Sequence, residues 1–139
     1  MSAAVHHINF VVHDLDRAVS VWEKLLDMPV AARDRLEQRG VITARFRLGA
    51  MWLVLVQPTR TDSVPGRFLA EHGEGFFLLS LGSEDLEAEV RRLGEDWFAG
   101  PVRTGLDGWQ VRDLDPRRTF GALLQLTCEH GSDGDPASA

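Results

Sequence analysis

Hydrophobic and polar positions alternate in a short segment near the start of the chain and again near its middle. The first segment is residues 7–12 and the second is residues 78–83. Alternation with a period of two is typical of a strand that buries one face. Each segment leads into a stretch in which apolar residues recur at three- and four-residue spacing, which is typical of an amphipathic helix. The pattern therefore predicts two strand–helix pairs.

The two predicted helices have similar beginnings. Asp14 can cap the first helix, and Ser83 or Asp85 can cap the second, because a short side-chain oxygen can accept from the free backbone N–H groups of the first turn. The apolar faces are formed by Leu15, Val19, Trp22 and Leu26 in the first helix and by Leu86, Val90 and Leu93 in the second.

The two pairs belong to an internal repeat. A constant offset of 71 residues places Asp14 over Asp85, and it also places residues 53–55 over residues 124–126 without a gap. Three more strands are predicted after each helix, at residues 30–37, 41–48 and 51–57 in the first copy and at residues 96–103, 109–113 and 122–128 in the second. Each copy is therefore a β-α-β-β-β module.

The modules are expected to form one domain over residues 1–130, because neither is large enough to close a core alone. Module one spans about residues 5–57 and module two about residues 76–129. Residues 58–75 contain two prolines and three glycines and are expected to be a linker. Residues 131–139 are small and polar, so we expect a disordered tail.

Composition narrows the possible partners. The chain has 139 residues, 44% of them hydrophobic, and a net charge of −6, so nucleic acid and anionic membrane surfaces are unfavourable partners. No apolar stretch is long enough to span a bilayer, and the first residues lack a secretion signal pattern. Cys128 is the single cysteine and is expected to be buried and inert. We therefore expect a cytoplasmic protein.

The tandem modules, with His7-Ile8 in the first strand and Asp-Leu-Asp or Asp-Leu-Glu at the helix starts, resemble the vicinal oxygen chelate superfamily. That superfamily includes glyoxalases, bleomycin resistance proteins, ring-cleaving dioxygenases and methylmalonyl-CoA epimerase. Residues 62–69, 72–76 and 115–124 are similar to the linker and closing hairpin of the epimerase branch. The resemblance implies an α+β fold with a cup-shaped, mostly antiparallel eight-stranded sheet, and a homodimer. It leaves open whether the modules pair within one chain or exchange between two.

The resemblance also implies four positions for a divalent metal, which fall on His7, Val54, Leu78 and Gln125. A catalytic ion needs about three protein ligands with lone pairs, plus an open position. Val54 and Leu78 have no such atoms, so we expect no metal and no other cofactor. The alternative is a divalent metal held by His7 and Gln125 with further ligands elsewhere.

Strand alternation predicts which side chains would line the cup. These mostly apolar and aromatic residues, with a few polar groups, are typical of a small-molecule site. Arg45 and Arg47 could join them in a register that the sequence does not fix. In the opposing interpretation the same side chains form core, and Gln125 hydrogen-bonds to His7; His6 and His13 are expected to face solvent. The predicted ligand-binding residues are His7, Asn9, Trp52, Val54, Phe76, Leu78, Ser80, Trp109, Leu123 and Gln125.

Two functions remain open from the sequence. The first is a metal-free protein that binds a hydrophobic, aromatic small molecule, similar to sequestering members of the superfamily with roles around natural products. The second is an isomerase or lyase similar to methylmalonyl-CoA epimerase or glyoxalase, either metal-dependent or using His7 as acid or base.

Overall fold

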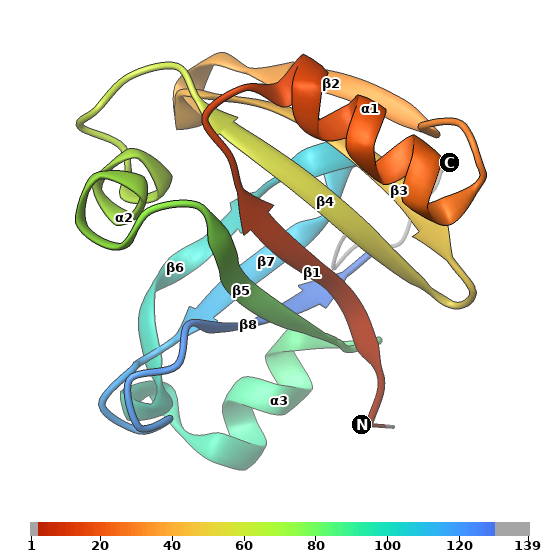
Figure 1. Cartoon of the computed structure of the whole chain (residues 1–139). Coiled ribbons are helices and arrows are strands. Elements are labelled where there is room, and N and C mark those ends of the chain that lie inside the picture. The colour runs from red at the N-terminus through yellow and green to blue at the C-terminus, as the bar shows by residue number, and fades with distance from the viewer. Residues whose placement is uncertain (1–2, 130–139) are drawn as a thin grey trace. The chain divides into compact units, whose positions relative to one another are not determined.

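The structure is a computed structural model that describes residues 3–129. These residues contain eight strands, three α-helices and three short 3-10 helices (Figure 1). They divide into two compact units. The N-terminal unit is His7–Phe77, and the C-terminal unit combines the residues up to His6 with those from Leu78 on.

The N-terminal unit contains four adjacent strands in the order β2-β3-β4-β1. β1 runs parallel to β4, whereas β2 and β4 are antiparallel to β3. The bounds are β1 (Val5–Val11), α1 (Leu15–Leu26), β2 (Ala32–Leu36), β3 (Val41–Leu48), β4 (Met51–Pro58) and α2 (Val64–His72). The predicted β-α-β-β-β order is confirmed for this copy.

The helix α1 forms as its sequence predicts. Asp14 caps it by accepting a hydrogen bond from the backbone N–H of Arg17 at 3.2 Å. Leu15 and Val19 are buried on its inner face, which packs on β3 and β4 (Figure 1). The sheet residues buried in the same cluster are Ala44, Phe46, Leu53 and Leu55. This packing covers one face of the N-terminal sheet.

The C-terminal unit repeats this arrangement with strand order β5-β8-β7-β6. β5 and β8 are parallel, and the other two pairs are antiparallel. Asp85, rather than Ser83, caps the helix through the N–H of Ala88 at 3.1 Å. The bounds are β5 (Gly75–Gly82), α3 (Leu86–Leu93), β6 (Phe98–Thr104), β7 (Gln110–Leu114) and β8 (Leu124–Cys128). The α+β class and the mostly antiparallel pairing are confirmed.

The predicted linker and several strand bounds differ from the structure; β2 begins at Ala32 and β8 at Leu124, each two residues later than predicted. The expected linker contains the helix α2, capped by Ser63, and its Phe68 packs against Phe77 with ring centroids 4.9 Å apart. A Cβ atom on Gly66 would lie 2.4 Å from the carbonyl oxygen of Arg60, so the first turn of α2 has room only for glycine. Strand β6 begins at Phe98 because residues 95–97 form a 3-10 turn.

Three further expectations concern termini, membrane and cysteine. Cys128 is buried, as predicted. No helix within residues 3–129 has the length and apolar character that a membrane crossing requires. The expected tail, residues 131–139, lies outside the described residues.

Candidate functional site

The N-terminal sheet has a second face, opposite α1, on which several predicted site residues lie. Ile8, Phe10 and Val12 pack with the α1 cluster, so their neighbours His7, Asn9 and Val11 point to the opposite side. The pairing of β1, β4 and β3 places these side chains in three rows across the sheet. The rows are His7–Trp52–Arg47, Asn9–Val54–Arg45 and Val11–Val56–Thr43. We call this set of nine residues the N-terminal face.

Trp52 is the aromatic centre of the N-terminal face. Its ring centroid lies 4.9 Å from Cζ of Arg45 and 4.9 Å from Cζ of Arg47. Arg45 is 8% exposed, and its guanidinium donates to Asp34 on β2 at 3.2 Å. Guanidinium groups at this distance are attracted to an indole ring by its negative face. The β3–β4 pairing thus settles the register that the sequence left open for both arginines.

Two buried oxygens on this face accept or donate no hydrogen bond among the described residues. They are Oδ1 of Asn9 and Oγ1 of Thr43. A buried polar atom without a partner costs about 1–3 kcal/mol, so native proteins usually pair such atoms with protein, ligand or water. His7, also on this face, is 4% exposed. The face therefore combines valines and an indole with polar groups, two of which have an oxygen without a partner among the described residues.

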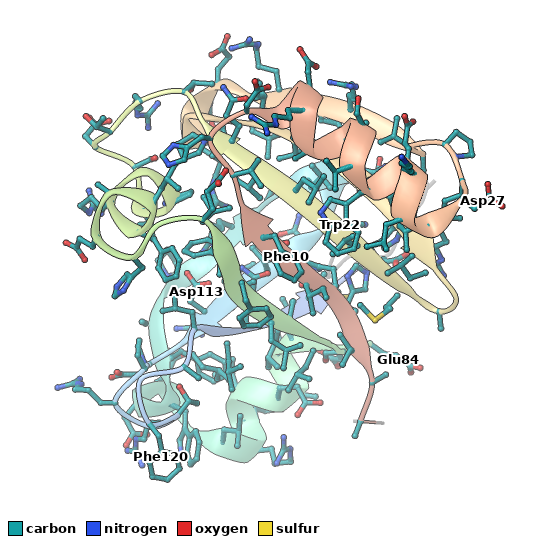
Figure 2. All side chains as sticks on the ribbon, in the orientation of Figure 1. Phe10, Trp22, Asp27, Glu84, Asp113 and Phe120 are labelled. Atoms are coloured by element: carbon teal, nitrogen blue, oxygen red, sulfur yellow. The ribbon has the colours of Figure 1, made fainter. Side chains whose placement is uncertain are left out.

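Phe76 is placed away from the N-terminal face. Its ring packs edge-on against Phe10, with centroids 5.9 Å apart, and Phe10 in turn lies 5.7 Å from Trp22 of α1. Figure 2 shows Phe10 and Trp22 close to one another, between β1 and α1. Phe76 is 52% exposed. The structure therefore does not bring Phe76 together with His7, Asn9, Trp52 and Val54, because its contact is on the α1 side.

The corresponding face of the C-terminal unit holds a chain of polar side chains. Gln125 donates from Nε2 to Oδ1 of Asp113 at 3.2 Å, and Thr127 donates to Oε1 of Gln125 at 3.5 Å. Ser80 contacts Thr127 and donates to the carbonyl oxygen of Gln125 at 3.3 Å. Arg103 forms two hydrogen bonds to the carboxylate of Asp113, at 2.5 and 3.3 Å. We call these five residues the C-terminal network.

Asp113, Arg103 and Thr127 of this network are not among the ligand-binding residues predicted from the sequence. Figure 2 shows the side chain of Asp113 on β7. Continuing the alternation from Trp109 and Val111 by one more step would have placed Asp113 on the same face. Within the network, the amide of Gln125 donates to Asp113 and accepts from Thr127.

The remaining predicted residues of the C-terminal unit are positioned as follows. Leu78 is buried, and Leu123 lies just before β8, where its carbonyl oxygen accepts from the N–H of Leu79 at 3.1 Å. Trp109 is buried and packs edge-on against the ring of His6, with centroids 4.5 Å apart.

The expectation that His6 faces solvent is wrong. Its side chain is only 10% exposed, because Trp109 packs against it and Nε2 lies 2.6 Å from Oε2 of Glu129. A half-open cleft of about 280 Å³ adjoins this pair. The residues lining the cleft are Ala4, His6, Gly82, Ser83, Glu84, Thr127 and Glu129.

Comparisons with known proteins identify the family. The model of the Glyoxalase/Bleomycin resistance protein/Dioxygenase superfamily matches residues 6–112. The chain belongs to this superfamily. The uncharacterized protein YqjC of Bacillus subtilis (strain 168) is 30% identical over 131 residues, which cover 91% of this chain and 92% of that protein.

Solved structures of superfamily members resemble this chain over most of its length. A variant of Streptomyces coelicolor methylmalonyl-CoA epimerase, in complex with 2-nitronate-propionyl-CoA, is 28% identical with a TM-score of 0.85 and covers 94% of this chain and 100% of that chain. The methylmalonyl-CoA epimerase from Mycobacterium tuberculosis is 24% identical with a TM-score of 0.85 over 97% of this chain and 91% of that one, which shows the shared fold.

The residues of this chain do not fit the divalent metal that the superfamily resemblance implies. In each unit one of the two expected positions, Val54 or Leu78, has an aliphatic side chain. At the others, His7 offers a ring nitrogen, whereas the amide of Gln125 already bonds to Thr127 and Asp113. Among residues 3–129 no group of three or more His, Cys, Asp or Glu side chains is arranged to hold a metal. A donor set of this kind falls short of the three ligands that such an ion needs.

Proposed function

We propose that this protein is a small-molecule-binding member of its superfamily that holds an aromatic ligand on the N-terminal face without a metal. His7, Asn9, Trp52 and Val54 are the residues of that face to which the proposal assigns binding. The ligand's ring packs against Trp52 and Val54, and its polar groups hydrogen-bond to Asn9 and His7.

The observation that carries the proposal is the pair of buried oxygens on Asn9 and Thr43. They flank Val54 and Val56 on the two neighbouring strands, so both are within the same patch of the sheet. A ligand with an N–H or O–H group would satisfy them, and an aromatic ring would fill the apolar surface between them.

Substitution of Asn9 separates a binding role from a structural one. In Asn9→Leu we expect the free energy of unfolding to stay the same or rise, because a buried acceptor without a partner is removed. Ligand affinity should fall about fivefold, the loss expected for one neutral hydrogen bond worth about 1 kcal/mol. Calorimetric titration with planar natural products measures the affinity, and thermal denaturation measures the stability. An Asn9→Leu variant that binds these compounds as well as the parent protein contradicts the proposal.

Trp52 offers a second test with a matched control. Trp52→Ala should abolish the fluorescence response to a planar ligand and weaken binding at least about tenfold, since it removes the aromatic surface. Trp97→Ala is the control, because Trp97 also packs against a guanidinium, that of Arg118 at 5.0 Å, but lies in the C-terminal unit. Equal losses in the two variants would argue against a site at Trp52.

An enzymatic function is the second candidate, and the 28% identity to the Streptomyces coelicolor epimerase favours it. In that case His7 would act as acid or base. The test is exchange of the α-hydrogen of methylmalonyl-CoA in deuterated water, which an epimerase-like protein would catalyse and His7→Ala would abolish. Under the binding proposal no exchange occurs, and protein purified without an affinity tag carries less than about a tenth of an equivalent of transition metal.

A further inference from the structure

We infer that the ligand of the N-terminal face is an aromatic carboxylate and that Arg47 binds its anionic group. The inference rests on the proposed function and specifies the chemical class of the ligand. It follows from a difference between the two arginines that contact Trp52.

Arg45 and Arg47 lie at the same distance from the Trp52 ring but differ in their other partners. Arg45 is buried, and the carboxylate of Asp34 balances its charge. Arg47 is exposed, and its Nε donates to the carbonyl oxygen of Gly49 at 2.9 Å. No carboxylate of residues 3–129 forms an ion pair with Arg47. The N-terminal face therefore presents one guanidinium whose charge the described residues leave unbalanced.

The surroundings of Arg47 restrict what can balance that charge. The bond to Gly49 and the contact with the indole ring hold the guanidinium in place, which leaves its terminal amino groups for an external acceptor. A guanidinium binds a carboxylate through two parallel hydrogen bonds, and such charge-assisted bonds are stronger than neutral ones. Trp52 and His7 share the row with Arg47, and Val54 lies in the next row. An anionic group bound at Arg47 would thus place an attached ring over Trp52 and Val54.

The two arginines of the edge strand β2, Arg33 and Arg35, differ from Arg47 in having acidic partners. Arg33 and Arg35 on β2 pair with Ala44 and Ile42 of β3, so they point to the side of the sheet that α1 covers. Arg33 lies 2.7 Å from Asp16 and Arg35 lies 3.8 Å from Glu37. Arg33 and Arg35 are thus each paired with an acid, whereas Arg47 on the N-terminal face is paired with none among the described residues.

The test compares probes that share a ring and differ in charge. By calorimetric titration, 2-naphthoate should bind at least about tenfold more tightly than the neutral 2-naphthamide, because a charge-assisted hydrogen-bond pair is gained. Acetate and inorganic phosphate carry charge without a ring and should show no saturable binding. Added salt should reduce the preference for naphthoate, since Arg47 is exposed.

Substitutions then assign the preference to one residue. Arg47→Met should reduce the ratio of 2-naphthoate affinity to 2-naphthamide affinity to about one, whereas Arg47→Lys should retain part of the preference. Arg35→Met is the matched control, an exposed arginine on the neighbouring edge strand, and should bind both probes as the parent protein does.

The outcomes separate the inference from the proposed function. If both probes bind equally and Arg47→Met changes neither, the inference is overturned and the aromatic binding site stands. If phosphate binds as well as naphthoate, a general anion site replaces the aromatic carboxylate. If neither naphthalene probe binds, the proposed function fails and the inference fails with it.

Discussion

The two units place an ion pair at matching positions of their sheets but with opposite polarity. In the N-terminal unit the cation Arg45 lies on β3 beside Val54, and its partner Asp34 lies on the edge strand β2. In the C-terminal unit the anion Asp113 lies on β7 beside Gln125, the residue 71 positions after Val54, and its partner Arg103 lies on the edge strand β6. Strand register decides which side chains meet, and the sequence then decides the sign of each charge.

The two faces also differ in how completely their buried polar atoms are hydrogen-bonded. In the C-terminal network, Asp113 accepts from Gln125 and Arg103, and Ser80 bonds to Thr127, so apart from Arg103 Nε the buried polar atoms of this network are paired within it. At the position of Ser80 the N-terminal unit has Asn9, whose Oδ1 is unpaired among the described residues. The C-terminal face thus pairs most of its own buried polar atoms, whereas the N-terminal face leaves Asn9 Oδ1 and Thr43 Oγ1 without a partner among the described residues. Five predictions test this comparison, from the largest expected effect to the smallest.

Truncating the core under either helix should have the largest effect. Leu53→Ala in the N-terminal unit and Leu126→Ala in the C-terminal unit each remove a nearly fully buried side chain, which costs about 2–5 kcal/mol. The sequence predicts a single domain, so urea denaturation should show one transition, shifted in both variants, by circular dichroism and by fluorescence. Two separate transitions, each sensitive to one substitution, would show that the units unfold independently.

Reversing the charge of Arg45 should have the next largest effect. Arg45→Asp places two carboxylates near one another and should lower the free energy of unfolding by about 2 kcal/mol, less than for a fully buried pair because Asp34 is 39% exposed. The double exchange Arg45→Asp with Asp34→Arg copies the polarity of the C-terminal unit and should recover at least half of that loss. Both the single and the double variant should bind 2-naphthoate more weakly than the parent protein does. If the double exchange is no more stable than the single one, the two pairs are not equivalent.

Ser80 and Asn9 occupy equivalent positions and should respond differently. Ser80→Ala removes a hydroxyl bonded to Thr127 and Gln125, so it should cost about 1–2 kcal/mol. Asn9→Leu should cost nothing in the same chemical denaturation experiment. Similar losses for both would mean that Asn9 is satisfied in solution as well as Ser80 is.

The two helix caps should contribute nearly equally to the free energy of unfolding. Asp14 and Asp85 accept from the third residue after them at 3.2 and 3.1 Å. Replacing either by alanine should lower the free energy of unfolding by about 1 kcal/mol. Asp→Asn at each position should restore most of the loss, and a large difference between the two caps would contradict the equivalence of the repeats.

The smallest effect concerns the connection between β7 and β8, where the two units differ. The N-terminal unit joins β3 to β4 through Gly49-Ala50, whereas the C-terminal unit uses residues 115–123, with Phe120 fully exposed (Figure 2). Hydrogen bonds from Arg117 lower the pKa of Asp115 below its ordinary value of 3.8. The carboxylate therefore stabilises the folded protein above that value, and the contribution is lost as the pH falls through the lowered pKa.

Thermal denaturation as a function of pH measures this contribution. The parent protein should have a slightly higher Tm than Asp115→Asn at pH 7, and the difference should vanish in strongly acidic buffer. The effect should be smaller than that of either helix cap, because the side chain of Arg117, the partner of Asp115, is 90% exposed to solvent. A difference that grows as the pH falls would contradict the assignment.

Much of the fold could be predicted from the sequence because its signals are local. The cap at Asp14, the helical spacing from Leu15 to Leu26 and the alternation from His7 to Val12 each depend on residues close in the chain. The offset of 71 residues then transferred these assignments to the second copy. The helix α2 was missed because the glycines and prolines around Ser63 resemble a linker, although Ser63 and Pro65 are also a typical helix start.

The candidate site was predicted only in part. Alternation placed His7, Asn9, Trp52 and Val54 on one face. It wrongly placed Phe76 with them, and Asp113 was not included in the predicted site. The contacts of Arg45 and Arg47 with Trp52 depend on which residue of β3 lies opposite which residue of β4. A shift of one residue in that pairing would turn both arginines to the other face of the sheet.

The sequence by itself determined the duplicated modules, the faces of their helices and strands, and the aliphatic residues at Val54 and Leu78. Tertiary structure decided that Asp34 balances the charge of Arg45 while Arg47 has no acidic partner among residues 3–129, and that Asp113 and Thr127 hydrogen-bond to Gln125. The reason is physical: periodicity records the environment of each residue along its own segment, whereas a charge pair or a hydrogen bond between strands depends on register, which is set by the packing of distant segments.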